Sequence, residues 1–428
     1  MHKIDYRYLR PKKAAWLQKM YEAPFPMRRE LRLWRGEQAT ILPRRYYDSD
    51  HLTNGRGGVA DRDGQYVELS ANGSRLRGSY PVENADFRDE KVVYCGYMFQ
   101  HWGHFLVESV TRLWYYLEND PTIDKYVFFL DENEERTING NYREFFELLQ
   151  IWNKLEFISR PTTYREVVVP ESAYECMQYW SDKYIAIFDA VAANAAVDPA
   201  WTPLEKIYFT RSHFAKDSGY EFGMDSLDHF FSKNGYTILA PERISLSQMI
   251  YYIRNAAEVA TISGTLPHNL LFGKNGQKLV VMERLVINVD HQVCVNQMRR
   301  LDAVHIDANF PLYTIDTHGP YMLGCNHILD RYAADNGLLP PDDYYTSEKY
   351  RDRCFKLYMR AYQDNYRYRW HKESWYPEIA DSLWEAYEDT YPYFKEYLDG
   401  NKPCLPEHYF QLHYLKQFVK RLLRRTAP

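Results

Sequence analysis

The sequence predicts an α/β fold built on parallel sheets that are covered by helices. Two observations support this prediction. From about residue 91, short runs of strand-forming residues alternate with segments of helical periodicity, which is the pattern of a parallel sheet with helices on both faces. Between residues 207 and 283 the order is strand, helix, strand, helix, strand, helix, strand. That order is typical of one nucleotide-binding half of a doubly wound fold.

The composition limits what kind of protein this chain can be. Its 428 residues give room for two or three domains, and its hydrophobic content of 45% supports a sizeable core. The net charge of −5 argues against nucleic acid as a partner. The 6 cysteines show no paired spacing, which argues against a structural zinc site or a disulfide framework and suits a reducing compartment. We find neither a signal-peptide pattern nor an apolar run of about 20 residues, and expect a cytoplasmic protein.

The first domain is placed at residues 1–200. Residues 1–90 are expected to be irregular or extended and to lie across a larger sheet, with a hairpin at 57–69 that turns at an Asp-Gly pair. Residues 171–203 indicate a helix followed by a linker. The other expected elements are strands at 91–95, 126–130, 154–158 and 166–169, and helices at 101–117 and 142–152.

The second domain, at 201–300, has clearer signals at the ends of its helices. Gly235 is a typical C-cap after the first helix. Ser245 and Gln248 form a capping box before the second helix. The expected elements are strands at 207–210, 236–239, 259–262 and 279–282, and helices at 224–233, at 245–257 and from Pro267 onward.

Residues 301–428 form a C-terminal extension that is loop-rich to about residue 340 and helical after it. The last helix, 407–425, has leucines on one face and basic residues over much of the rest. A helix of this kind can lie on an anionic membrane surface. The alternative is that its leucines pack on the first domain.

The helix at 101–117 carries the first group of candidate functional residues. At about 100° per residue, His101, His104, Glu108 and Arg112 share one stripe opposite an apolar stripe. A carboxylate one turn from an imidazole and near a guanidinium is suited to accepting a proton from a hydroxyl group. Two alternatives stay open: an exposed helix face with an i,i+4 pair, and a hydrolase zinc site formed by the two histidines and Glu108.

A loop of small residues after the strand at 259–262 is the second candidate site. A strand, a loop and a helix start bind anions, because the first helical N–H groups are unpaired and the helix dipole is positive there. His268 can donate to a phosphate oxygen, or be a packed imidazole; Asn269 can bond a phosphate or lock the loop. The candidate diphosphate contacts are Ser263, Gly264, Thr265, His268 and Asn269.

Arg211 and Glu283 end two further strands of the same expected sheet. Open parallel sheets bind ligands at the carboxyl ends of their strands. A guanidinium there can clamp phosphate oxygens bidentately, and a carboxylate can accept both hydroxyls of a ribose. Exposed side chains without a ligand are the alternative for both residues. No G-x-G-x-x-G or P-loop fingerprint is present.

Taken together, three blocks of the sequence resemble glycosyltransferase family 61, over roughly residues 94–284. The first, His104-Phe105-Leu106-Val107-Glu108, is similar to the family's His followed four residues later by an acid. The second, Tyr208-Phe209-Thr210-Arg211, is similar to its strand ending in Arg. The third runs from Gly235 through the 263–272 loop to Glu283. Its loop reads Ser-Gly-Thr-Leu-Pro-His, without the Gly-Ala-Gly that the family usually carries.

The resemblance implies a GT-B architecture, in which two Rossmann-like domains face a cleft, and inverting sugar transfer without an obligatory metal or other cofactor. It implies a hexosyl- or pentosyltransferase of capsule- or lipopolysaccharide-type polysaccharide biosynthesis. Glu108, helped by His104, would be the base, with His101 and Arg112 toward the acceptor. Arg211 and the 263–269 loop would hold the diphosphate, and Glu283 the ribose.

The expected partners are a nucleotide-sugar, with a UDP-sugar favoured, and a glycan or lipid-linked acceptor. An acceptor of the second kind would be met at the inner membrane face, through the basic last helix. Two alternatives are kept: a related polysaccharide-modifying transferase, for example one that adds pyruvyl groups, and a nucleotide-sugar- or glycan-binding protein without turnover.

Overall fold

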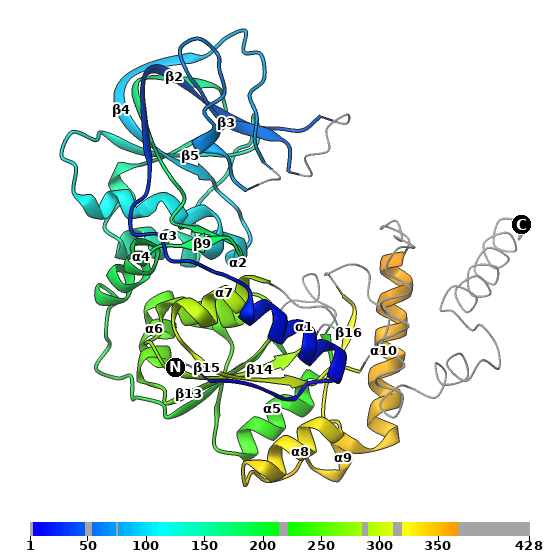
Figure 1. Ribbon diagram of the computed structural model, residues 1–428. Coiled ribbons are helices and arrows are strands. Elements are labelled where there is room, and N and C mark those ends of the chain that lie inside the picture. Colours follow the sequence, from blue (N-terminus) through cyan, green and yellow to red (C-terminus); the bar gives the residue numbers. More distant parts are fainter. Residues whose placement is uncertain are drawn as a thin grey trace, which may run out of the picture.

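The computed structural model describes residues 3–47, 54–73, 76–213, 221–284, 290–310 and 319–366. Within these ranges the chain is a mixed α/β protein with two six-stranded sheets, which confirms the predicted α/β class (Figure 1). The basic helix predicted at 407–425 lies outside the described residues.

The first sheet has the order β3-β2-β7-β4-β5-β6. Strands β7, β4, β5 and β6 pair in parallel, as the alternation of strands and helices predicts, whereas β2 runs antiparallel to both β7 and β3. The N-terminal part of the chain therefore adds an antiparallel edge, and the sheet is mixed and curled into a half barrel. Its strands are β2 (Leu33–Arg45), β3 (Arg56–Ala60), β4 (Asp86–Tyr97), β5 (Lys125–Phe129), β6 (Leu155–Ile158) and β7 (Thr162–Pro170).

The hairpin predicted at 57–69 is present only in part. Its turn forms, because the Asp61 N–H donates to the Gln65 carbonyl at 2.8 Å. The second arm is reduced to one bridge between Ala60 and Tyr66. The chain then enters a short 3-10 helix, η1 (Glu68–Ser70).

The helix predicted at 101–117 is broken in two. It consists of α2 (Trp102–Val107) and the 3-10 helix η2 (Ser109–Glu118), which meet at Glu108 with φ −129° and ψ −46°. A 3-10 helix turns by about 120° per residue rather than 100°. Side chains before and after Glu108 therefore do not continue one stripe. The prediction of a single four-residue polar stripe is wrong for this reason.

We call each six-stranded sheet, together with the helices that cover it, one half of the protein. The remaining helices of the first half cover the face of its sheet that is turned toward the second half (Figure 1). They are α3 (Gly140–Leu148) and α4 (Asp182–Ala193), the latter capped by Ser181, whose side chain accepts the Lys183 N–H. A two-strand hairpin, β8 (Tyr174–Glu175) and β9 (Tyr179–Trp180), precedes α4.

The second sheet is parallel throughout, in the order β1-β15-β14-β13-β10-β12. The predicted helix at 224–233 is confirmed as α5 (Met224–Lys233). Helix α6 (Leu246–Asn255) begins where the capping box predicts, since Ser245 Oγ accepts the Gln248 N–H at 3.1 Å. The predicted strands are confirmed as β10 (Lys206–Phe209), β12 (Thr237–Leu239), β13 (Glu258–Ile262) and β14 (Lys278–Glu283).

Two strands of this sheet come from parts of the chain where the sequence analysis placed none. β1 (Ile4–Tyr8) pairs with β15 (Asp302–Asp307) at the edge of the sheet. The helix α1 (Pro11–Glu22) follows β1 and lies along the same sheet, near α7 (Asp290–Met298) (Figure 1). Residues 4–22, which the predicted first domain includes, thus belong structurally to the second sheet.

Part of the predicted C-terminal extension also belongs to the second sheet. Besides β15, helix α8 (His327–Asp335) packs against it, and two more helices follow, α9 (Asp343–Thr346) and α10 (Glu348–Tyr366). A short pair, β11 (Glu221–Phe222) and β16 (Tyr321–Met322), lies beside the main sheet.

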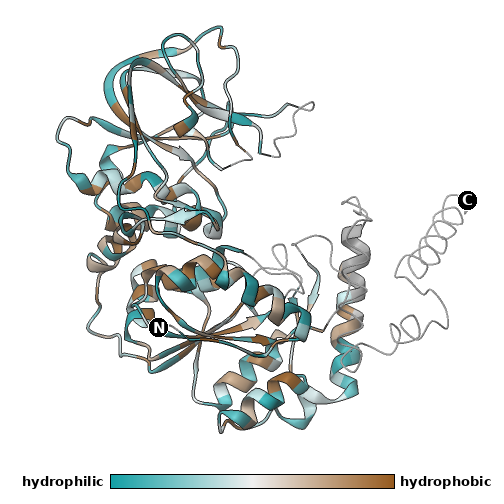
Figure 2. Cartoon of the chain, in the orientation of Figure 1, coloured by the Kyte–Doolittle hydropathy of each residue, from teal (hydrophilic) through white to brown (hydrophobic). Residues whose placement is uncertain are grey.

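A single hydrophobic cluster runs through both halves. Phe145 of the first half contacts Phe272 of the second, with ring centroids 6.2 Å apart, and Phe188 lies 5.3 Å from the same ring. Hydrophobic residues also follow the central strands of the second sheet (Figure 2). Because both sheets share this core, the boundary between them is packed. Among the described residues, no helix is both long and apolar enough to cross a membrane.

Candidate functional site

Two candidate segments that are distant in the sequence meet at the boundary between the sheets. The Trp102 indole N–H of α2 donates to Asn269 Oδ1 at 2.8 Å. Asn269 lies in η5 (Leu266–Phe272), the short helix that follows the 263–265 loop. A Cβ added at Gly103 would lie 2.9 Å from Thr265 Oγ1, so a larger residue would require the Thr265 side chain to shift. The sequence predicted both segments but not their contact.

A carboxylate and imidazole groups gather on the first-half side of this contact. His104 Nδ1 lies 2.6 Å from Glu108 Oε1, which confirms the predicted pairing. The His104 side chain is 50% exposed and that of Glu108 29%, so the pair is open to a ligand. The His101 ring packs 5.0 Å from the His104 ring.

The second half adds an imidazole that the sequence analysis did not select. His291 of α7 places Nε2 3.9 Å from Glu108 Oε1. Its Nδ1 lies 2.8 Å from the hydroxyl of Tyr174. Burial raises the pKa of Tyr174 well above its usual value, so the hydroxyl keeps its proton. His291 thus lies between Tyr174 and Glu108.

The two predicted polar residues of η5 are engaged inside the protein. His268 is 4% exposed, and its Nδ1 lies 2.8 Å from Gln292 Oε1. Burial, and then the neighbouring His291, lower the pKa of His268 to about 3, so its ring is neutral at physiological pH. Asn269 accepts from Trp102 and donates to the Leu266 carbonyl at 2.9 Å. His268 is thus a packed imidazole and Asn269 holds the loop in place, as the alternative interpretations of these two residues proposed.

Positive charge near the loop comes from two arginines that share one carboxylate. Arg211, at the end of β10, bonds Glu221 Oε2 through Nε at 2.8 Å. Arg284, directly after β14, bonds the other oxygen of Glu221. Both guanidinium groups are mostly buried. Two arginines and one carboxylate thus lie together at the carboxyl edge of the sheet.

Arg284 is also fitted closely to the loop. Its backbone N–H donates to Ser263 Oγ at 3.0 Å. Gly264 has φ +118°, and a Cβ there would lie 2.5 Å from Arg284 Nη2. Within the described residues, Arg284 Nε is buried without a hydrogen-bond partner. Since η5 is a 3-10 helix of only 7 residues, the arginine pair is a stronger source of positive charge here than the helix dipole.

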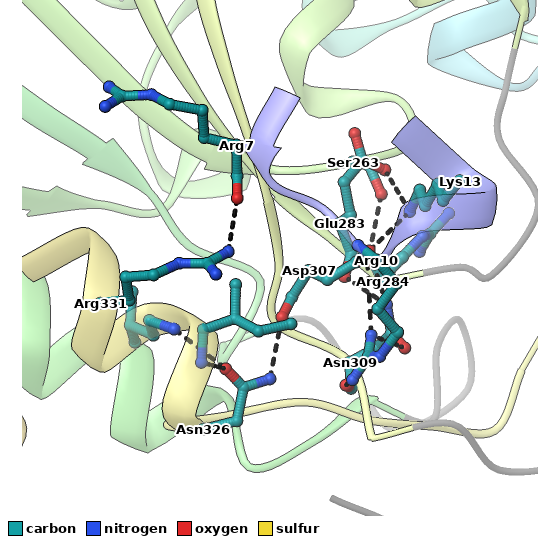
Figure 3. Close-up of polar contacts among 12 residues, drawn as sticks. Arg7, Arg10, Lys13, Ser263, Glu283, Arg284, Asp307, Asn309, Asn326 and Arg331 are labelled. Carbon is teal, nitrogen blue, oxygen red and sulfur yellow. Dashed lines mark hydrogen bonds and ion pairs between the residues drawn. The ribbon is translucent and has the colours of Figure 1, made fainter. Parts of the chain in front are cut away.

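The Glu283 carboxylate lies in a buried ion-pair network with Lys13 of α1 (Figure 3). Lys13 Nζ lies 3.2 Å from Glu283 Oε2 and 3.1 Å from Asp307 Oδ1. His305 Nδ1 lies 2.8 Å from Glu283 Oε1. Glu283 is 1% exposed, and despite burial, Lys13 and His305 lower its pKa to about 2. Both oxygens are thus occupied, and the geometry does not fit the predicted ribose contact.

Arg112 is also a buried structural residue. It is 2% exposed and donates to the carbonyls of Leu69, Ala71 and Pro170 at 3.0, 2.7 and 3.0 Å. These carbonyls belong to the first sheet and its loops. The break at Glu108 turns Arg112 toward them, so its predicted place beside an acceptor is not observed.

We expect Arg112→Met to destabilise the protein by about 3 kcal/mol, because it leaves several buried carbonyls without donors. Urea denaturation at neutral pH would measure this. Arg143→Met is a suitable control, since Arg143 is 53% exposed and makes a surface pair with Glu147 and a cation–π contact with Trp152; its effect should be within about 1 kcal/mol. Equal stability of the two variants would contradict the structural role of Arg112.

Other features of the molecule are less suited to be the site. The described residues include no group of three or more His, Cys, Asp or Glu side chains placed to hold a metal ion. An open hollow of about 700 Å³ lies on the curled first sheet, lined by residues such as Gln38, Tyr80 and Phe87. It contains none of the predicted site residues.

The sequence matches no model of a known protein family, and no curated protein matches it significantly. The likeness to glycosyltransferase family 61 therefore depends on the three sequence blocks described above.

Proposed function

We propose that the protein is an inverting glycosyltransferase that moves a sugar from a nucleotide-sugar to a glycan or lipid-linked acceptor in surface polysaccharide biosynthesis. The observation that carries this proposal is that two groups of residues lie on opposite sides of the boundary between the halves. An exposed carboxylate–imidazole pair, Glu108 and His104, lies on one side. A loop flanked by two buried arginines, Arg211 and Arg284, lies on the other.

In the proposed reaction, Glu108 accepts the proton of an acceptor hydroxyl. That oxygen attacks the anomeric carbon, while the bond from this carbon to the diphosphate breaks on the opposite face and its electron pair stays on the diphosphate. Arg211, Arg284 and the backbone of the Ser263–Thr265 loop stabilise the charge that develops there. His104 and His291 position the Glu108 carboxylate.

This reaction suits a GT-B arrangement, in which a donor domain and an acceptor domain meet at the site. Two observations support it: the parallel second sheet carries the loop and the arginines at its carboxyl edge, and Trp102 and Gly103 of the first half contact η5 directly. The favoured donor remains a UDP-sugar. Compared with the sequence-based assignment, Arg284 replaces His268 and Glu283 as a donor contact.

The proposal can be tested first by binding. A thermal-shift screen against UDP-, GDP-, CMP- and dTDP-linked sugars should show one nucleotide that raises the melting temperature, because a ligand that binds only the folded state stabilises it. Transfer or hydrolysis of the selected donor, followed by mass spectrometry of the product, would then establish turnover and the group transferred. Binding without any turnover, with candidate acceptors present, would instead indicate a nucleotide-sugar-binding protein.

We expect Arg211→Gln and Arg284→Gln each to weaken nucleotide affinity about tenfold or more, since a hydrogen bond to a charged group contributes about 1.5–3 kcal/mol. Isothermal titration with the selected nucleotide diphosphate would measure the loss. Arg243→Gln is the matched control, because Arg243 is an exposed arginine of the same half. If both variants bind like the control, the arginine pair does not hold the diphosphate.

A further inference from the structure

Two cysteines face each other across the boundary between the halves. Cys176 lies in the hairpin between β8 and β9, and Cys294 lies in α7 of the second half. The N–H of Met177 donates to Cys294 Sγ at 3.3 Å, and Met177 Sδ lies 3.5 Å from the same sulfur. The two thiols are also close enough for each to shift the pKa of the other.

This geometry suits a direct sulfur–sulfur bond. A disulfide requires the two Cα atoms to lie within about 7 Å. The Met177 nitrogen is bonded to the carbonyl carbon of Cys176, so its 3.3 Å contact brings the Cys294 sulfur close to the Cys176 backbone. The Cys294 sulfur therefore lies beside the residue with which it would be bridged.

The surroundings give the two sulfurs different roles. Cys294 is buried, whereas Cys176 is partly exposed. The Cys176 side chain, and then the Met177 N–H that donates to the Cys294 sulfur, lower the pKa of Cys294. The accessible sulfur of Cys176 is thus the first to meet a reagent, and the buried sulfur of Cys294 is placed beside it for a second step.

We propose that Cys176 and Cys294 are a site of reversible oxidation, which a small disulfide such as glutathione disulfide converts into a bond between the two halves. First, the Cys176 sulfur attacks one sulfur of glutathione disulfide, and its proton leaves with the released glutathione. The Cys294 thiolate then attacks the Cys176 sulfur of this mixed disulfide and expels the second glutathione as a thiolate. One dithiol and one glutathione disulfide thus become one protein disulfide and two glutathione molecules.

A disulfide between Cys176 and Cys294 would affect the candidate site around Glu108. Tyr174 and Cys176 lie in the same hairpin, and His291 and Cys294 lie one turn apart on α7. The disulfide would therefore fix the Tyr174–His291 hydrogen bond and, through it, the neighbourhood of Glu108. In a reducing compartment the pair stays as a dithiol, and the bond forms when glutathione becomes oxidised. The modification itself does not depend on the proposed glycosyl transfer.

The test uses the full chain, first reduced and freed of reductant, and then incubated under native conditions with glutathione disulfide. We expect two of the 6 thiols to disappear, and a non-reducing digest to yield one peptide pair that joins Cys176 to Cys294. Dithiothreitol should restore both thiols. The oxidised protein should melt at a higher temperature, because the bond closes a long loop in the unfolded chain.

Two variants distinguish the attack by Cys176 from the later attack by Cys294. Cys294→Ser should stop at one glutathionyl group on Cys176, whereas Cys176→Ser should show no modification at either position. The buried Cys95, whose pKa is raised by burial, serves as an internal control and should stay reduced. The proposal is overturned if the wild-type protein keeps all its thiols, retains glutathione on Cys176, or links Cys176 to a different cysteine.

Discussion

Glu108→Gln should remove most of the sugar transfer while the protein still binds its nucleotide. The amide keeps the shape and the hydrogen-bond reach of the carboxylate but cannot accept the acceptor's proton. General-base catalysis contributes about 10²–10⁴-fold to a rate, and we expect turnover to fall by that factor. Single-turnover transfer from the selected donor is the appropriate measurement, with nucleotide affinity recorded in parallel.

The chain offers a close control for this variant. Glu118 ends the same 3-10 helix, is 48% exposed and pairs with Lys183, away from His104 and His291. Glu118→Gln should leave turnover unchanged. Equal turnover in both variants would remove Glu108 from the base role, whereas loss of nucleotide binding in Glu108→Gln alone would point to a structural effect.

Lys13→Met should produce the largest loss of stability that we predict. Lys13 is 4% exposed in its side chain and is paired with both Glu283 and Asp307. Its removal leaves two carboxylates buried with too little positive charge, a change that costs about 3–5 kcal/mol. The midpoint of urea denaturation would show this. Lys19→Met, on the exposed face of the same helix, should have little effect, and similar midpoints for the two variants would contradict the role of the network.

The same network makes stability depend on pH. The pKa of Glu283 is about 2 in the folded protein, below its ordinary value of 4.5. The unfolded chain therefore binds more protons between these values, so this contribution is complete above pH 4.5 and is lost as the pH falls toward 2. It amounts to about 3 kcal/mol. Urea denaturation at pH 7 and pH 3 should show a smaller difference in Lys13→Met than in the natural protein.

Much of the second sheet could be predicted from local patterns. Its inner strands are short apolar runs, which parallel strands buried on both faces require. Ser245 marks the start of α6 because an N-cap depends on neighbouring residues only. β1 could not be predicted in this way. Its partner, β15, lies about 300 residues away, and no local pattern encodes such a pairing.

The candidate site shows the same contrast between local contacts, which could be predicted, and contacts between distant segments, which could not. The His104–Glu108 pair is a contact within one helical turn, and the sequence predicted it. Glu283 ends a strand as predicted, but its surroundings are set by Lys13, which arrives from the other end of the chain. His291 and Arg284 become site residues only through packing between segments that are distant in the sequence.

The pairing of β1 with β15 has a consequence for how the protein is made. During synthesis the residues of β1 leave the ribosome about 300 residues before those of their partner, β15. At about 5–20 residues per second, that delay is roughly 15–60 s. Throughout this time Lys13 lacks its native partners Glu283 and Asp307, and β1 has no strand to pair with. The edge of the second sheet and the ion-pair network beneath α1 can therefore form only late in synthesis.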